Sequence, residues 1–172
     1  MKSLKLLLSA ILLLTATSIT LAGYLYRIDL LVFTHATPEA IHSENWSPYP
    51  KLPNYLQASV LSANTPASYA LKPYANILNR QANYHVILSK TWQQTITGRK
   101  RRIRITSHGQ GLDGVLTLNQ TNYINMDFNL LYQNGVSAYP IQLDTQRRMR
   151  PRELHYVDNP VLGVLVQATP IG

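Results

Sequence analysis

The stretch Gly114-Val-Leu-Thr-Leu-Asn-Gln-Thr-Asn-Tyr-Ile-Asn-Met-Asp-Phe-Asn-Leu-Leu-Tyr132 decides the predicted fold. It contains two strand-like runs, 114–119 and 123–132, and the residues that join them, 119–122, are polar and favour a turn. Two short strands joined directly by a turn pair antiparallel, because parallel strands need a long crossover. The stretch therefore predicts an antiparallel hairpin.

The same pattern continues on both sides of this hairpin. Further strand-like runs cover 24–33, 84–94, 100–107, 141–149 and 161–168. Turn residues separate several of them, at Gly98, Gly109-Gln-Gly111, Asp113-Gly114 and Asn134-Gly135. We therefore expect an α+β domain with an antiparallel sheet of about six or seven strands.

One helix is expected, over Lys72–Ala82. Pro73 suits a first helical turn. The helix should pack on a face of the sheet, because apolar side chains recur at helical spacing, at Leu71, Tyr74, Ala75 and Leu78. The run 24–33 ends in continuous apolar residues, so we expect its end to be buried on both faces.

The segment 34–71 is predicted to be a long Pro-rich loop. Regular structure is broken by five prolines, Pro38, Pro48, Pro50, Pro53 and Pro66. Trp46, Tyr49 and Tyr55 also lie in it, which indicates a loop that lies on the domain rather than a free linker.

The N-terminus has the layout of a secretory signal peptide. Lys2 and Lys5 precede the apolar block 6–14, and Thr20 and Ala22 are small residues suited to cleavage. The alternative is an uncleaved membrane anchor, but 6–22 is short for a span and contains several hydroxyl side chains. We predict that 1–22 is removed and that 23–172 forms a single domain without stable membrane insertion.

The composition favours the bacterial periplasm. The chain has no cysteine, so it has neither disulfides nor thiolate metal ligands. A secreted domain without disulfides fits a periplasm better than an animal extracellular module. The chain is also basic, with a formal net charge of +8.

The positive charge is concentrated in two clusters, 99–104 and 147–152. In a strand, Arg102 and Arg104 share one face, and Arg148 and Arg150 likewise share one. If the two strands are neighbours, the four arginines form a cationic stripe, which would suit carboxylates or phosphates. The alternative is an ordinary solvated surface.

Export makes nucleic acid an improbable partner for this stripe. In a periplasm, the abundant anions are the stem-peptide carboxylates of peptidoglycan and lipid phosphates. Exposed aromatic side chains could stack on sugar rings, although aromatics in strands commonly serve packing instead. The candidates are Trp92, Tyr123, Tyr132 and Tyr139.

We expect no enzymatic activity, no metal site and no cofactor. No pair of acids stands at a spacing suited to general acid–base catalysis, and the five histidines are scattered without ligand spacing. The sequence contains neither a Gly-rich phosphate loop nor a Gly-x-Ser-x-Gly nucleophile elbow.

The block Glu153-Leu-His-Tyr-Val-Asp158 has two interpretations. As a structural brace, Glu153 and Asp158 would pair with nearby arginines, while Pro151 and Pro160 hold the chain extended before the last strand. Alternatively, His155 and Tyr156 would contact a ligand directly. We favour the brace, in which we include Pro160 and Gly163.

This C-terminal block resembles the CsiV family of periplasmic, peptidoglycan-binding cell-shape-integrity proteins. The matching residues are Arg147, Arg148, Met149, Arg150, Glu153, Leu154, His155, Tyr156, Asp158, Pro160, Gly163, Val164, Leu165 and Val166. The run Tyr26–Phe33 and the pair Trp92 and Gln94 also resemble the family, whereas the Pro-rich middle does not. Asn159 and Ser89 stand where the family commonly has His. If either of these histidines contacts the ligand in the family, this chain lacks that contact.

The resemblance implies a non-enzymatic periplasmic protein that binds peptidoglycan and supports cell-wall assembly or remodelling. The binding candidates are Arg102, Arg104, Arg148, Arg150, Trp92, Tyr123, His155 and Tyr156. An alternative is an adaptor or regulator that binds a wall-synthesis protein instead of the wall. A third, weaker alternative is binding to anionic lipid.

Overall fold

The structure, a computed structural model, describes residues 23–35, 46–62, 65–107, 109–133, 135 and 137–171. The predicted signal peptide, 1–22, lies outside these residues. The described elements are β1 (Tyr24–Thr34), β2 (Ala58–Val60), α3 (Lys72–Leu78), β3 (His85–Ile96), β4 (Arg101–Ser107), β5 (Leu112–Gln120), β6 (Ile124–Tyr132), β7 (Ile141–Met149), β8 (Leu154–Asp158) and β9 (Leu162–Pro170).

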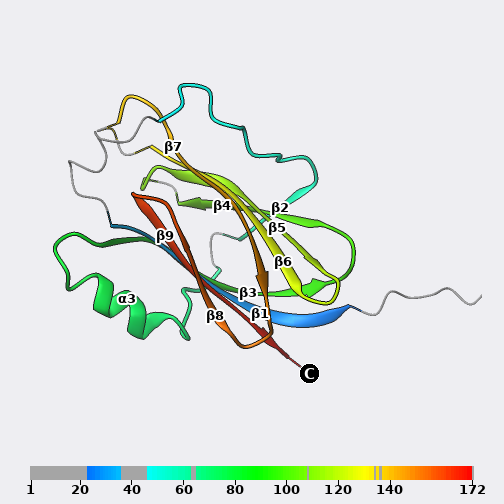
Figure 1. The fold of residues 1–172 in the computed structure, drawn as a ribbon. Coiled ribbons are helices and arrows are strands. Elements are labelled where there is room, and N and C mark those ends of the chain that lie inside the picture. Colours follow the sequence, from blue (N-terminus) through cyan, green and yellow to red (C-terminus); the bar gives the residue numbers. More distant parts are fainter. Residues whose placement is uncertain are drawn as a thin grey trace, which may run out of the picture.

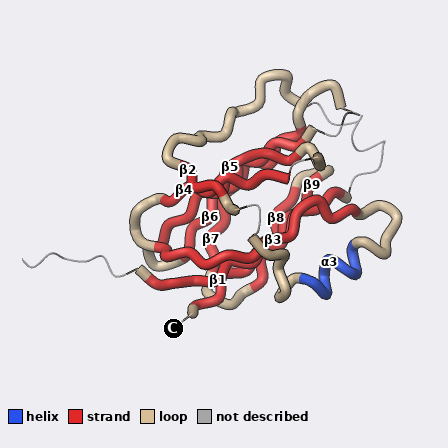
Figure 2. The backbone as a smooth tube through the Cα atoms, turned by 180° about the vertical axis from the view of Figure 1, so that it is seen from behind, coloured by secondary structure: helices blue, strands red, loops and turns tan. Residues whose placement is uncertain are grey.

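The strands form two sheets that pack face to face (Figures 1 and 2). The four-stranded sheet has the order β3-β1-β9-β8, and the five-stranded sheet has the order β2-β4-β5-β6-β7. The predicted single sheet is therefore wrong. Both ends of the chain supply the four-stranded sheet, and periodicity alone does not reveal such long-range pairing.

The expected antiparallel hairpin is confirmed, with β5 pairing β6 from Leu112↔Tyr132 to Gln120↔Ile124. β4 and β7 extend it on either side as antiparallel neighbours. The short edge strand β2 departs from this pattern, because it runs parallel to β4.

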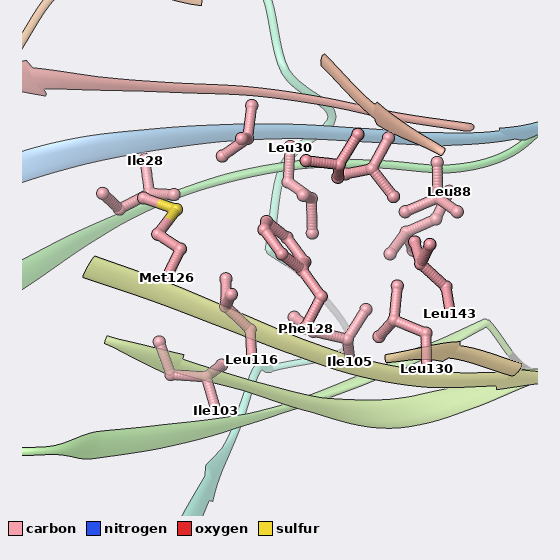
Figure 3. Packing of buried hydrophobic residues seen from close by; sticks show 14 of the residues in the cluster. Ile28, Leu30, Leu88, Ile103, Ile105, Leu116, Met126, Phe128, Leu130 and Leu143 are labelled. Atoms are coloured by element: carbon pink, nitrogen blue, oxygen red, sulfur yellow. The ribbon is translucent and has the colours of Figure 1, made fainter. Parts of the chain in front are cut away.

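The hydrophobic core fills the space between the sheets (Figure 3). Ile28 and Leu30 of β1 point toward Met126 and Phe128 of β6, and these four side chains are at most 1% exposed. Alternation explains this arrangement, since every second side chain of a strand points to the same face. The opposite faces of the two sheets are then free to differ in chemistry.

β1 is buried on both faces over its second half, as predicted. It is an inner strand of its sheet, between β3 and β9. On its outer face, the carboxylate of Asp29 is 1% exposed and accepts hydrogen bonds from Ser68 Oγ at 2.7 Å and Arg27 Nε at 2.9 Å. The chain before α3 thus covers this side of β1, and Leu71 is buried within it.

The helix α3 is shorter than expected, and its predicted packing on a face of the sheet is reduced to a slight contact with β3. It begins at Lys72, with Pro73 in its first turn as predicted, but it ends at Leu78 and buries none of its residues. Leu71, just before the helix, provides the buried contact instead. The apolar spacing predicted that Tyr74 would also pack against the sheet, but its side chain remains 43% exposed.

The described part of the Pro-rich segment lies on the domain, as predicted. Its residues 46–57 pass along the outer face of the five-stranded sheet (cyan in Figure 1). The backbone N–H of Lys51 donates to Gln142 Oε1 at 3.1 Å, and Asn129 Nδ2 donates to the Lys51 carbonyl at 3.1 Å. Side-chain amides of two strands therefore hold this segment where proline prevents it from pairing as a strand.

Gly163 of β9 leaves room for the ring of Phe33, which stands beside it on β1. A Cβ atom at position 163 would lie 2.4 Å from Cζ of Phe33, and Phe33 itself is buried. A side chain at position 163 would thus displace a buried ring.

We predict that Gly163→Ala lowers the free energy of unfolding by about 1–3 kcal/mol, the usual cost of overpacking. Urea denaturation measures it. In a Phe33→Leu background the ring no longer fills this space, so the effect of Gly163→Ala should shrink. An equal loss in both backgrounds would refute the steric explanation.

Candidate functional site

The outer face of the five-stranded sheet carries ordered rows of polar side chains. The register aligns Arg102, Thr117, Asp127 and Gln146 across β4 to β7. The next row aligns Asn119, Asn125 and Arg148. It lies near the C-terminal ends of β5 and β7 and the N-terminal end of β6. On β5 and β6 the residues between the two rows, Leu118 and Met126, are buried in the core, so the polar residues beside them face outward. On β7 the residue between the rows is Arg147, which is exposed.

Two adjoining hollows on this face share Lys100, Asp127 and Gln146, and together they form one groove. The first, about 430 Å³, is lined by Lys100, Asn119, Asn125, Asp127, Gln146, Arg147 and Arg148. The second extends under the Pro-rich segment to Lys51, Leu52 and Asn54, over Arg102 and Thr117. The groove thus crosses four strands and has the loop as one wall.

Some of the charges on this face are fixed by close pairs. Arg104 donates two hydrogen bonds to Asp113, both 3.0 Å long, and its guanidinium lies 5.0 Å from the ring centroid of Tyr55. Tyr55 donates from its hydroxyl to the same carboxylate at 3.0 Å. At the far end, Lys51 Nζ lies 2.9 Å from Asp144 Oδ2.

The pKa values of the Arg104 cluster follow from these bonds. Partial burial would raise the pKa of Asp113, but the hydrogen bonds from Arg104 and Tyr55 outweigh it and lower that pKa. The bonds to Asp113 raise the pKa of Arg104. Partial burial and the separate hydrogen bond from its own hydroxyl to Asp113 raise the pKa of Tyr55. Asp113 and Arg104 are therefore both charged at neutral pH.

Other charges in the groove are loosely paired. Lys100 Nζ lies 3.8 Å from Asp127 Oδ2, which is beyond hydrogen-bond distance. Within the described part of the chain, no ion pair or side-chain hydrogen bond engages Arg147 or Arg148. Arg102 donates to the Leu56 carbonyl at 3.2 Å, so it anchors the loop and lines the groove.

The predicted stripe of four neighbouring arginines is not present. β5 and β6 separate β4 from β7, so the two arginine strands are not neighbours. Arg102 and Arg148 nevertheless open into the same groove. Arg104 is occupied by Asp113, and Arg150 lies in the turn after β7, 3.9 Å from Glu153.

The remaining predicted binding residues lie apart from this groove. Trp92 on β3 packs partly buried against the core, and Tyr123 precedes β6 with 40% exposure. His155 and Tyr156 belong to β8 in the other sheet. The binding candidates proposed from sequence therefore divide between two sheets.

The 153–163 block makes contacts within the fold. Glu153 Oε2 lies 3.3 Å from His155 Nε2, and Asp158 accepts a hydrogen bond from the Tyr156 hydroxyl at 2.9 Å. Partial burial and this bond raise the pKa of Tyr156 to about 12. Pro160 lies in the turn before β9, next to Asn159.

The two positions that depart from the family's histidines have structural contacts here. Asn159 Oδ1 accepts from the backbone N–H groups of Val161 and Leu162, and its Nδ2 donates to the Gln142 carbonyl at 2.8 Å. Asn159 therefore links the last turn to β7 in the other sheet. Ser89 accepts from the Ser68 backbone N–H, which fixes the segment over β1.

Sequence reasoning assigned no binding role to five residues that line the first hollow, namely Lys100, Asn119, Asn125, Asp127 and Gln146. Lys100 belonged to the charge cluster 99–104, and the other four have no motif of their own. For those four, the available information was the alternation of β5, β6 and β7, which places these side chains on the face opposite the core. Without the strand order, this pattern could not show that they converge.

A separate hollow lies between the edges of the two sheets, beside β3 and β4. Its lining is mostly apolar and includes Leu88 and Ile105, and its cations are Lys90 and Arg104. Lys90 Nζ already donates to the Thr65 carbonyl at 2.7 Å, and Arg104 is held by Asp113. Both cations of this hollow are thus already hydrogen-bonded within the described part of the fold, unlike Lys100 and Arg148 in the groove.

Within the described ranges, no group of His, Asp or Glu side chains is arranged to hold a metal ion. In the same part of the chain, no helix is long and apolar enough to span a bilayer.

Comparison with known families gives one match. The family model described as "Peptidoglycan-binding protein, CsiV" matches residues 3–171, nearly the whole chain. The match includes the Pro-rich middle, which the sequence resemblance had left unassigned. Neither a curated protein nor a solved structure matches the chain significantly.

We predict that Asp113→Asn reduces stability at neutral pH and has a smaller effect in acid. Because folding lowers the pKa of Asp113, its ionised form stabilises the native state above the ordinary value of 3.8. That contribution is lost as the pH falls through the lower folded-state pKa. Urea unfolding at several pH values should show the difference from wild type narrowing below 3.8. A difference in unfolding free energy that stays constant with pH would contradict this role. As a control, Tyr55→Phe keeps the pair of Arg104 with Asp113 and should retain most of the pH dependence of wild type.

Proposed function

The chain belongs to the CsiV family, and we propose that it is a non-enzymatic periplasmic protein that binds peptidoglycan through the groove on its five-stranded sheet. In this role it would support cell-wall assembly or remodelling. The family description names peptidoglycan as a partner and gives no reaction. The signal-peptide pattern predicted at 1–22 supports the periplasmic location.

The loosely held charges of the groove are the observation that carries this proposal. Lys100 and Arg148 flank the amide side chains of Asn119 and Asn125 in one open hollow. Cations of this kind bind carboxylates, and amides both donate to and accept from hydroxyl and acetamido groups. Peptidoglycan combines these groups, since its glycan carries hydroxyl and acetamido groups and its stem peptides carry carboxylates.

The groove also has a suitable shape. It extends across four strands and is open to solvent, so an extended polymer can lie along it without threading its ends through the protein. One wall is the segment held by Gln142 and Asn129. A ligand would therefore meet a largely preformed surface, which lowers the entropic cost of binding.

A second candidate function is an adaptor that binds a wall-synthesis protein. Leu154 and Tyr156 of β8 are 37% and 45% exposed on the outer face of the four-stranded sheet. Exposed apolar and aromatic side chains are enriched at protein interfaces. This surface belongs to the other sheet, so binding there would leave the groove accessible.

We predict that Lys100→Ala/Arg148→Ala weakens retention on insoluble peptidoglycan by at least about tenfold, since each charge-assisted hydrogen bond contributes about 1.5–3 kcal/mol. Co-sedimentation of the mature protein over a range of peptidoglycan concentrations measures it. The matched control is Lys72→Ala/Arg80→Ala, which removes two exposed charges outside the groove. Equal retention of both double variants would refute the groove as the binding surface.

The adaptor hypothesis predicts a different result. A photo-crosslinking amino acid in place of Leu154 should capture a wall-synthesis protein in cells, whereas one in place of Tyr139, 44% exposed, should not. A mature protein that fails to sediment with peptidoglycan but is captured from position 154 would favour the adaptor. Capture from both positions would show that the contact is nonspecific.

A further inference from the structure

Asp127 differs from the other carboxylates on the outer face of the five-stranded sheet. Asp113 accepts two bonds from Arg104, and Asp144 lies 2.9 Å from Lys51. Among the described residues, Lys100 is the one cation within 4.0 Å of the Asp127 carboxylate, at 3.8 Å, and no hydrogen bond to this carboxylate is formed. Its side chain is 30% exposed and lines both hollows of the groove.

Cations stand on both sides of this carboxylate. Asp127 pairs with Gln146 on β7, so Arg148 is its diagonal neighbour two residues further along that strand. Diagonal positions are roughly 7–8 Å apart, within reach of a long side chain. Lys100 approaches from the β4 side, and the three side chains line the same hollow.

This arrangement offers both signs of charge to a ligand. A purely anionic ligand would meet repulsion from Asp127, and an uncharged glycan would leave all three charges without a partner. A group that carries an ammonium and a carboxylate on one carbon can satisfy both signs at once. Asn119, Asn125 and Gln146 supply amide donors and acceptors around it.

We propose that this hollow binds a free amino-acid centre, with its ammonium at Asp127 and its carboxylate at Lys100 and Arg148. The proposal rests on peptidoglycan as the ligand and specifies which part of it is recognised. Free centres of this kind occur on stem peptides that contain meso-diaminopimelate, at the distal carbon of its side chain. Cross-linking converts the ammonium of the acceptor stem into an amide and removes its charge, so the protein would favour stem peptides whose distal diaminopimelate amine is free.

Two soluble peptides test this. The first is N-acetyl-L-Ala-γ-D-Glu-meso-diaminopimelate, whose distal centre holds the one free ammonium, and the second is the same peptide acetylated there. Calorimetric titration of the mature protein should show about tenfold tighter binding of the first, the value of one charge-assisted hydrogen bond. Asp127→Asn should abolish this preference and leave the second peptide bound at least as well as by wild type. Asp144→Asn, on the same face but at the Lys51 end, should keep the preference.

Equal affinity of wild type for both peptides, or an unchanged preference in Asp127→Asn, would overturn the inference. If neither peptide binds while intact peptidoglycan is still retained through Lys100 and Arg148, the inference fails and the proposed function stands. If wild type retains neither peptidoglycan nor peptide, both fail. A circular dichroism spectrum and an unfolding midpoint like those of wild type would confirm that Asp127→Asn is folded.

Discussion

The structure depends on the burial of β1 on both of its faces. One face supplies Ile28 and Leu30 to the core between the sheets, and the other lies under the chain that leads to α3. Burial of an apolar strand on both sides contributes about 25 cal/mol for each Å² removed from water. It also requires a partner for Asp29, which Ser68 and Arg27 provide. β1 thereby becomes a covered, structural strand, whereas β8 at the edge of the same sheet keeps Leu154 and Tyr156 exposed.

The outer face of the five-stranded sheet is less covered than β1 and is therefore accessible to a ligand. Its inner face supplies Phe128, Met126 and Leu116 to the core, and the Pro-rich segment covers only part of its outer face. Close pairs such as Arg104 with Asp113 fix part of that face, while Lys100, Asp127 and Arg148 keep unused bonding capacity. Loosely paired charges on a rigid sheet favour ligand binding, because the side chains are positioned by the fold and are not already neutralised.

Much of the local structure could be predicted from the sequence, because it depends on near neighbours. The hairpin of β5 and β6, the burial of β1, Pro73 at the helix start and the loop lying on the domain follow from periodicity and backbone chemistry. The assignment of β8 and β9 to a different sheet from β7 could not be predicted, since it depends on pairing with β1 across more than a hundred residues. The arginine clusters could be identified from the sequence, but whether their strands are neighbours could not, and Arg148 pairs with Asn125 instead of lying beside Arg104. Asp127 had no sequence motif at all, and its importance comes from what lies next to it.

The central claim is that peptidoglycan fragments bind on the outer face of the five-stranded sheet. It is tested most directly by nuclear magnetic resonance of the isotope-labelled mature protein during titration with soluble muropeptides. The account predicts saturable shifts of the side-chain amides of Asn119, Asn125 and Gln146, and of backbone amides in β6 and β7 around Asp127. The four-stranded sheet should change little. Shifts confined to Tyr156 and its neighbours on β8 and β1, with the groove unaffected, would contradict it.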